Sequence, residues 1–165
     1  MVRIEDFQAD DRFYVDAWNL KRIMVMPVRN YSVCKIRIGD IIRELEGKIY
    51  RLEDTDVYRY LDGSESSKTV YREYCLTNGG ANSNRREDSY NTLIKELSKK
   101  GYDIKKGAIF VNQYNMVQEG QHRCCVLLYL YGPEKMIDVV KLHYGGLRIK
   151  QRVRYLKWRV AQLIK

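Results

Sequence analysis

The sequence predicts an α+β fold, and three observations support this class. Residues 33–38 alternate apolar with mostly polar side chains, which is typical of a half-buried strand. The stretch over residues 87–142 reads as helix, hairpin, helix and strand. Hydrophobic residues make up 45% of the 165 residues and only two prolines are present, so the chain is apolar enough to fold compactly.

The N-terminal part predicts an arm followed by a strand. Residues 1–21 mix acidic and aromatic side chains without a clean period, and we expect a packed arm or a short helix there. Residues 22–28 are rich in methionine, isoleucine and valine. Asn30 and Tyr31 suit a turn between this segment and the alternating strand.

Three short helices are expected next. Asp40 can cap a helix that runs through Glu46 and ends at Gly47, because its carboxylate would accept hydrogen bonds from free amides of the first turn. Two tyrosine-rich helical stretches follow at residues 55–61 and 67–76, with a turn-forming Asp-Gly-Ser sequence between them.

A loop and a longer helix lie in the middle of the chain. Residues 77–83 are rich in glycine and asparagine, which tolerate a positive φ, so they predict a flexible loop or a lid. Leucine and isoleucine at helical spacing indicate a helix over residues 87–100, and Gly101 ends it.

The next elements surround a short polar sequence. Residues 108–111 and 116–118 flank a turn and predict a β-hairpin. A helix begins at Gly120 and stops at a Gly-Pro pair, after which residues 136–142 form an apolar, β-branched strand. We therefore expect one domain over residues 1–147.

Residues 148–165 predict a basic amphipathic C-terminal helix beside that domain. Its apolar residues recur at alternating intervals of four and three, and its other faces are basic. Three uses stay open: binding an anionic membrane surface, binding nucleic acid, or packing the stripe on the protein's own domain, which we favour. The stripe consists of Ile149, Val153, Leu156, Val160 and Leu163.

The amino-acid composition indicates which kinds of partner the protein binds and where in the cell we expect it. A net charge of +9 favours an acidic partner, namely nucleic acid, a phosphorylated substrate or an anionic membrane face. We expect a cytoplasmic protein, because the chain shows neither a secretory signal nor a long apolar run. The four scattered cysteines match neither a zinc pattern nor a CxxC pair, and we expect buried or idle thiols.

Residues 119–123, the sequence Glu-Gly-Gln-His-Arg, form a candidate phosphate site that we call the box. A strand ends there and a helix begins, so free amides and the positive end of the helix dipole converge on one spot. Gly120 allows close backbone approach, His122 can donate to an oxygen, and Arg123 can grip two phosphate oxygens. In a competing interpretation, Glu119 is a hairpin residue paired with Arg123, and His122 is a polar group at a helix start.

The run AIFVNQYNMVQEGQHR and the following CCVLLYLYGPEKMIDVVKL resemble the ParB/sulfiredoxin-like family. In that family a hairpin delivers a GxxR or DGxHR box, and a helix, a glycine and a final strand follow. The resemblance extends upstream, where Asn84, Arg85 and Arg86 stand like an Asn-Pro-Arg box, so the best-matched core is residues 84–142. It implies a small mixed sheet with flanking helices.

The resemblance also implies a function. A nucleoside triphosphate, ATP or CTP with Mg²⁺, would be bound by its phosphates and either hydrolysed or used to phosphorylate a small hydroxyl acceptor. Glu119 would hold Mg²⁺ or act as general base in place of the family's commoner aspartate. The implied phosphate-binding residues are Gly120, Gln121, His122, Arg123, Arg85 and Arg86.

The departures from the family narrow this expectation. Sulfiredoxins carry a reactive cysteine before His-Arg, and Gln121 stands there, so we do not expect cysteine-based repair. Partition proteins continue into a helix-turn-helix domain and a dimerisation tail, whereas this chain has only about twenty residues after its last predicted strand. We therefore do not expect a full partition role either. A nucleic-acid-binding module or a nuclease is the alternative class, although no clustered acids indicate a two-metal site. A homodimer is a further expectation.

Overall fold

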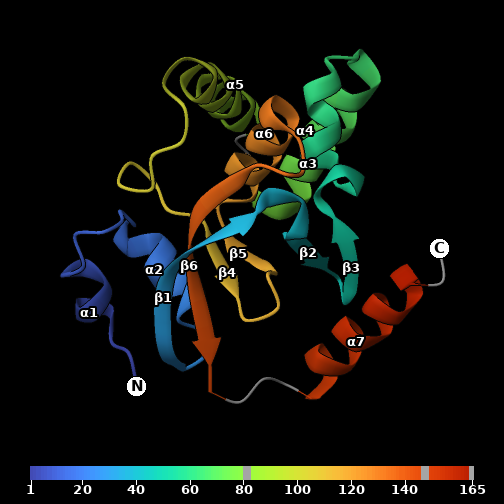
Figure 1. The fold of residues 1–165 in the computed structure, drawn as a ribbon. Coiled ribbons are helices and arrows are strands. Elements are labelled where there is room, and N and C mark those ends of the chain that lie inside the picture. Colours follow the sequence, from blue (N-terminus) through green and yellow to red (C-terminus); the bar gives the residue numbers. More distant parts are fainter. Residues whose placement is uncertain (80–82, 146–148, 164–165) are drawn as a thin grey trace.

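The computed structural model describes residues 1–79, 83–145 and 149–163, and its fold is α+β, as expected. Seven α-helices and six strands in these residues form a four-stranded mixed sheet, a separate two-stranded hairpin and flanking helices (Figure 1). No helix within the described ranges is long and apolar enough to cross a membrane. The elements are α1 Ile4–Gln8, α2 Ala17–Ile23, β1 Val28–Arg37, β2 Ile42–Leu45, β3 Lys48–Arg51, α3 Asp56–Arg59, α4 Glu65–Gly79, α5 Ser83–Lys100, β4 Phe110–Asn112, β5 Val117–Glu119, α6 Gln121–Tyr131, β6 Met136–Tyr144 and α7 Ile149–Leu163.

The four-stranded sheet has the order β1-β6-β4-β5. Its central strand β6 runs antiparallel to β1, with Val33 opposite Val140, and parallel to β4, with Phe110 opposite Val140. The hairpin from β4 to β5 completes the sheet and ends at Glu119. The box therefore begins at the end of the edge strand β5.

Both faces of the sheet are buried, and each belongs to a different core. Val139 and Val111 point into one core with α3, α4, α5 and α6. Phe110 and Leu142 point into the other core with α1 and α2. Successive side chains of a strand point to opposite faces, so each apolar strand serves both cores. Figure 1 shows the two helical layers on either side of the sheet.

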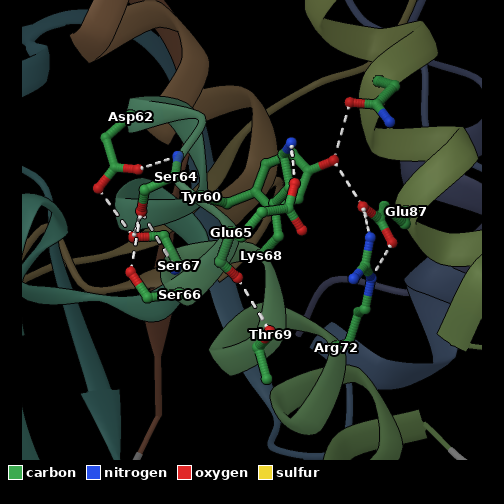
Figure 2. Close-up of polar contacts among 11 residues, drawn as sticks. Tyr60, Asp62, Ser64, Glu65, Ser66, Ser67, Lys68, Thr69, Arg72 and Glu87 are labelled. Atoms are coloured by element: carbon green, nitrogen blue, oxygen red, sulfur yellow. Dashed lines mark hydrogen bonds and ion pairs between the residues drawn. The ribbon is translucent and has the colours of Figure 1, made fainter.

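The helices α4 and α5 are joined by a polar cluster (Figure 2). Arg72 of α4 makes a bidentate ion pair with Glu87 of α5, at 2.6 and 3.0 Å. The hydroxyl of Tyr60 lies 3.1 Å from the same carboxylate and 3.0 Å from the amide oxygen of Asn91. These contacts join two helices that both line the cavity described below.

The expected helices and strands around the box are confirmed, with small changes at their ends. The predicted helix at 87–100 begins at Ser83, and the strand at 136–142 runs on to Tyr144. The predicted loop at 77–83 begins too early, because α4 continues to Gly79, and residues 80–82 lie outside the described residues. The helices expected at 55–61 and 67–76 are present as α3 with a 3-10 turn and as α4.

Two predictions for the first half of the chain are wrong. Asn30 and Tyr31 form no turn; they lie within β1, where the pairing register with β6 shifts between Val28 and Asn30. The helix expected from Asp40 to Glu46 is instead the hairpin β2–β3. Glu46 and Gly47 both have a positive φ, which matches a two-residue hairpin turn.

The orientation expected for the C-terminal helix is also wrong. Its apolar stripe does not pack on the domain: Val153, Leu156, Val160 and Leu163 are 41%, 52%, 56% and 82% exposed. The helix α7 lies instead beside the β2–β3 hairpin, at the lower right of Figure 1, and contacts it with polar side chains.

Candidate functional site

The β4–β5 hairpin delivers the box, and its turn is fixed by a buried amide. The Oδ1 atom of Asn112 accepts hydrogen bonds from the backbone amides of Tyr114 and Met116, at 2.9 and 3.0 Å. Asn115 has a φ of 59°, which closes the turn. The strand β5 then carries Glu119 and Gly120 to one edge of the sheet.

Gly120 turns the chain from β5 into α6 in a way that only glycine accommodates easily. Its φ is 89°, in the left-handed region. A Cβ at this position would lie 3.0 Å from Cγ1 and 3.2 Å from Cα of Ile109. The missing side chain of Gly120 therefore lets the turn pack closely against Ile109. Its approach to a phosphate stays a prediction.

The first turn of α6 presents free backbone amides. The first helical hydrogen bond runs from the amide of Cys124 to the oxygen of Gly120, at 3.0 Å, and no side chain caps the helix. The amides of Gln121, His122 and Arg123 thus have no acceptor within the helix. Because the following residues of α6 are buried, this turn is held rigidly and its dipole favours an anion.

A cavity of about 740 Å³ lies at this helix end. Its walls come from α2, β2, α4, α5, β5 and the first turn of α6, so segments far apart in the sequence meet there. The complete box lines it, together with Arg86. Arg85 belongs to the first turn of α5, but its side chain lies outside the described residues.

The cavity is strongly basic. Guanidinium groups of Arg22, Arg43, Arg86 and Arg123 line it, against the single carboxylate of Glu119. That carboxylate is paired with Arg22 at 3.3 Å, and Arg43 donates to the backbone oxygen of Val117 at 3.3 Å. Within the described residues, no carboxylate pairs with the other three arginines. The interpretation that pairs Glu119 with Arg123 is thus wrong, because Arg22 takes that place.

Arg123 is positioned by a glycine rather than by an acid. A Cβ on Gly107 would lie 2.5 Å from one terminal nitrogen of Arg123 and 2.7 Å from its Cζ. The missing side chain of Gly107 therefore makes the space that the guanidinium fills. This packing holds the cation at the cavity wall, and no carboxylate of a described residue pairs with it.

His122 belongs to an aromatic wall of the cavity. Its ring packs edge-on against Tyr90, with centroids 4.7 Å apart, and its Nε2 lies 2.9 Å from the hydroxyl of Tyr71. Burial, and then the charges of Arg86, Arg123 and Arg43, lower the pKa of His122 to about 4. The imidazole is neutral at neutral pH, so it contributes a hydrogen-bonding nitrogen and no charge.

Sequence reasoning did not place Trp18, Arg22 and Arg43 at the site, although all three line the cavity. Trp18 and Arg22 lie four residues apart on α2, and the guanidinium of Arg22 sits 4.8 Å from the centroid of the Trp18 ring. Trp18 is 66% exposed at the cavity. Arg43 was missed because β2 was expected to be a helix. The spacing of four residues between Trp18 and Arg22 could have shown that they share one side of a helix. The sequence of the N-terminal arm does not indicate on which part of the domain this helix packs.

The cysteines are not nucleophiles of this site. Cys75, Cys124 and Cys125 are buried free thiols, as expected. Burial raises the pKa of each of them, that of Cys125 to about 12. Thiols with such raised pKa values stay protonated at neutral pH and react poorly.

The described residues contain no group of three or more histidine, cysteine, aspartate or glutamate side chains arranged to hold a metal ion. A smaller cavity of about 260 Å³ adjoins the first and shares Arg43, Tyr74 and Gln121 with it. Asp54 and Asp56 line its other side.

Comparison of the chain with protein-family models, curated proteins and solved structures found no match. The functional argument therefore rests on the geometry and chemistry of the cavity.

Proposed function

We propose that the protein binds a nucleoside triphosphate, with the phosphates at the first turn of α6. The observation that carries this proposal is the cavity itself. Three guanidinium groups without carboxylate partners in the described chain face the same space as three free backbone amides. Cations that surround a recessed space without compensation favour a multiply charged anion.

Besides the groups that would bind phosphate, the cavity has an exposed aromatic ring, and this favours a nucleotide as the ligand. Trp18 stands at the same cavity with most of its surface exposed. An exposed indole ring next to bound phosphates is a stacking surface for a nucleobase. Arg22 already covers part of that ring, which leaves the remaining surface for the base.

We also propose that the fold is ParB/sulfiredoxin-like. The succession of hairpin, glycine turn, helix and parallel strand over β4, β5, α6 and β6 agrees with the family pattern on which the sequence resemblance was based. The position of the box at a cavity agrees with the use that the family makes of it. This support comes from the order of the elements.

Glu119 is the candidate for chemistry on the terminal phosphate. Its carboxylate is the only one that lines the larger cavity among the described residues. Mg²⁺ commonly takes one or two carboxylates and completes its shell with water and substrate phosphates, so Glu119 could serve as its protein ligand. Bound there, Mg²⁺ would neutralise charge on the phosphates. Glu119→Gln should keep nucleotide binding and lose release of inorganic phosphate.

Calorimetric titration with ATP, CTP and inorganic tripolyphosphate tests the binding proposal. Arg123→Ala should weaken all three by roughly a hundredfold, because a charge-assisted, bidentate contact is lost. The matched control is Arg152→Ala, which removes the same charge from the exposed surface of α7. Equal affinities for Arg123→Ala and the control would refute the phosphate site.

Trp18→Ala separates a nucleotide site from a phosphate site. The affinity for ATP or CTP should fall by roughly tenfold, whereas the affinity for tripolyphosphate should stay the same. Trp18→Phe should restore most of the loss, since it returns a stacking ring. If a short single-stranded oligonucleotide binds more tightly than either nucleotide and Arg123→Ala abolishes that binding, the cavity serves nucleic acid instead.

A further inference from the structure

The helix α7 docks with its polar side and leaves its apolar side in solvent. Gln151 and Arg154 both reach the carboxylate of Glu44 on β2, each at 2.7 Å. Tyr155 stacks on Tyr114 of the β4–β5 turn, with ring centroids 4.6 Å apart. A surface helix normally packs on its domain with the apolar face, so this arrangement is inverted. The apolar face stays open for a partner.

The exposed stripe has the spacing of a coiled-coil seam. Val153 and Val160 occupy one heptad position, and Leu156 and Leu163 occupy the other, at intervals of three, four and three residues. Valine at the first of these positions with leucine at the second favours a two-stranded assembly. A seam of two residues per heptad is also narrower than the apolar face of a helix that lies in a membrane.

The flanks of the seam are basic on both sides. Arg152 and Arg159 border it on one side and Lys157 on the other, and all three are exposed. None of them forms an ion pair with another described residue. Residues at these positions decide which helix can pair with the seam.

A second copy of the chain does not fit this seam. In either orientation, two copies of α7 would bring basic flanks against basic flanks, and like charges across a seam oppose pairing. The expected homodimer therefore has no support from α7. The partner that complements the seam is a helix with apolar seam positions and acidic flanks.

We propose that α7 binds an acidic amphipathic helix of a partner protein, which pairs with the seam formed by Val153, Leu156, Val160 and Leu163. The apolar seam supplies the contact area, and the three basic side chains select an acidic partner. The polar docking of α7 on Glu44 keeps the seam turned outward, ready for the partner. This interaction is separate from the nucleotide cavity.

Two synthetic helices test the proposal on the full chain. Both have about three heptads, long enough to be helical on binding, with valine and leucine in the seam. One carries glutamate on both flanks and the other carries lysine. Binding, followed by fluorescence anisotropy of the labelled helices, should be seen for the glutamate helix and be at least about tenfold weaker for the lysine helix.

A charge reversal makes the test sharper. The double variant Arg152→Glu and Arg159→Glu should exchange the preference, binding the lysine helix more tightly than the glutamate helix. Val160→Asp should abolish binding of both, and unchanged circular dichroism would show that the fold persists.

Several results would overturn the proposal. Binding of neither helix, or equal binding of both, removes the charge selection on which it depends. Tighter binding of vesicles with anionic lipid, or of duplex DNA, assigns the helix to a membrane or to nucleic acid. Self-association of the protein that Val160→Asp abolishes assigns the seam to a second copy.

Discussion

The cavity at the first turn of α6 and the helix α7 are both rich in arginine, yet they present this charge in opposite ways. In the cavity, Arg43, Arg86 and Arg123 surround a concave space together with free amides of α6. On α7, Arg152 and Arg159 border a convex apolar seam. The concave arrangement concentrates positive potential at one point, where a small anion can bind. The convex arrangement distributes the positive potential along the length of α7. The net charge of +9 alone could not separate these uses.

The largest effect is expected from Gly120→Ala, which attacks the turn on which the cavity depends. The change imposes a positive φ on alanine and pushes its Cβ to 3.0 Å from Ile109. We expect a loss of about 3 kcal/mol in the free energy of unfolding and no detectable nucleotide binding. Urea denaturation and calorimetry measure the two effects.

Gly63→Ala is the matched control for Gly120→Ala. Gly63 also has a positive φ, of 77°, but nothing lies within 4 Å of an added Cβ. It should cost only about 1 kcal/mol and leave nucleotide affinity intact. Equal losses in the two variants would mean that the contact with Ile109 is unimportant.

The second effect is a pH dependence that should come from the cavity wall and not from α7. His122 takes up a proton with a pKa of about 4 in the folded protein, against 6.5 when unperturbed. The unfolded chain therefore binds more protons between these values, and stability falls as the pH drops from 6.5 towards 4. Above pH 6.5 the imidazole is neutral in both the folded and the unfolded chain, so it no longer makes the free energy of unfolding depend on pH.

Comparison with His122→Gln separates the effect of His122 on stability from that of carboxylates, which titrate in a similar pH range. At about pH 5 the wild type should have lost roughly 2 kcal/mol that the variant does not lose. Denaturation at a series of pH values gives both slopes. Identical slopes would show that the imidazole takes up its proton as easily in the folded chain as in the unfolded one.

A smaller effect is expected from Gly107→Ala, which displaces the side chain of Arg123 without substituting that residue. The new methyl group would occupy the place of a flexible guanidinium, so the fold should lose no more than about 0.5 kcal/mol. Nucleotide affinity should fall by roughly tenfold, because the cation is displaced from the wall. In the background of Arg123→Ala, the same change should have no further effect on affinity.

The smallest effect is expected on the α7 side. Arg154→Ala removes an ion pair of 2.7 Å with Glu44. A half-exposed pair of this kind contributes about 0.5 kcal/mol, so global stability should barely change. Nucleotide affinity should stay the same, while amide exchange in α7 should become faster. A drop in nucleotide affinity would show that the cavity and the helix α7 are coupled and do not act independently.

The box and its surroundings could be predicted because their signals are local. A polar turn at Asn112, the glycine at 120 and a Gly-Pro stop after α6 mark three successive boundaries. The apolar residues between them are consistent with only one order of helix and strand. As a result, the sequence correctly predicts β4, β5, α6 and β6.

The β2–β3 hairpin could not be predicted in this way, because its signal is ambiguous. A glycine with positive φ suits both the end of a helix and the centre of a hairpin turn, so Gly47 favours neither. Contacts distant in sequence decide the outcome: Ile42 forms a bridge with Met116, and its amide donates to the oxygen of Asn115 at 3.1 Å. Arg43 reaches the cavity only as a result of this pairing.

The orientation of α7 was missed for a related reason. The stripe of apolar residues identifies a seam, but it does not say what covers the seam. Glu44 and Tyr114, which attract the opposite side of the helix, belong to elements far away in the sequence. The same limit applies to Trp18, whose place at the cavity follows from the docking of α2 beside β5.

The pairing of β1 with β6 has a consequence for how the chain is made. Val33 and its partner Val140 are separated by about a hundred residues, and closing so long a loop is slow and entropically costly. During synthesis, β1 emerges long before the strand that will pair with it. Its hydrogen-bonding edge stays open over that interval, so the nascent chain depends on its helices, and on protection from other chains, until β6 arrives.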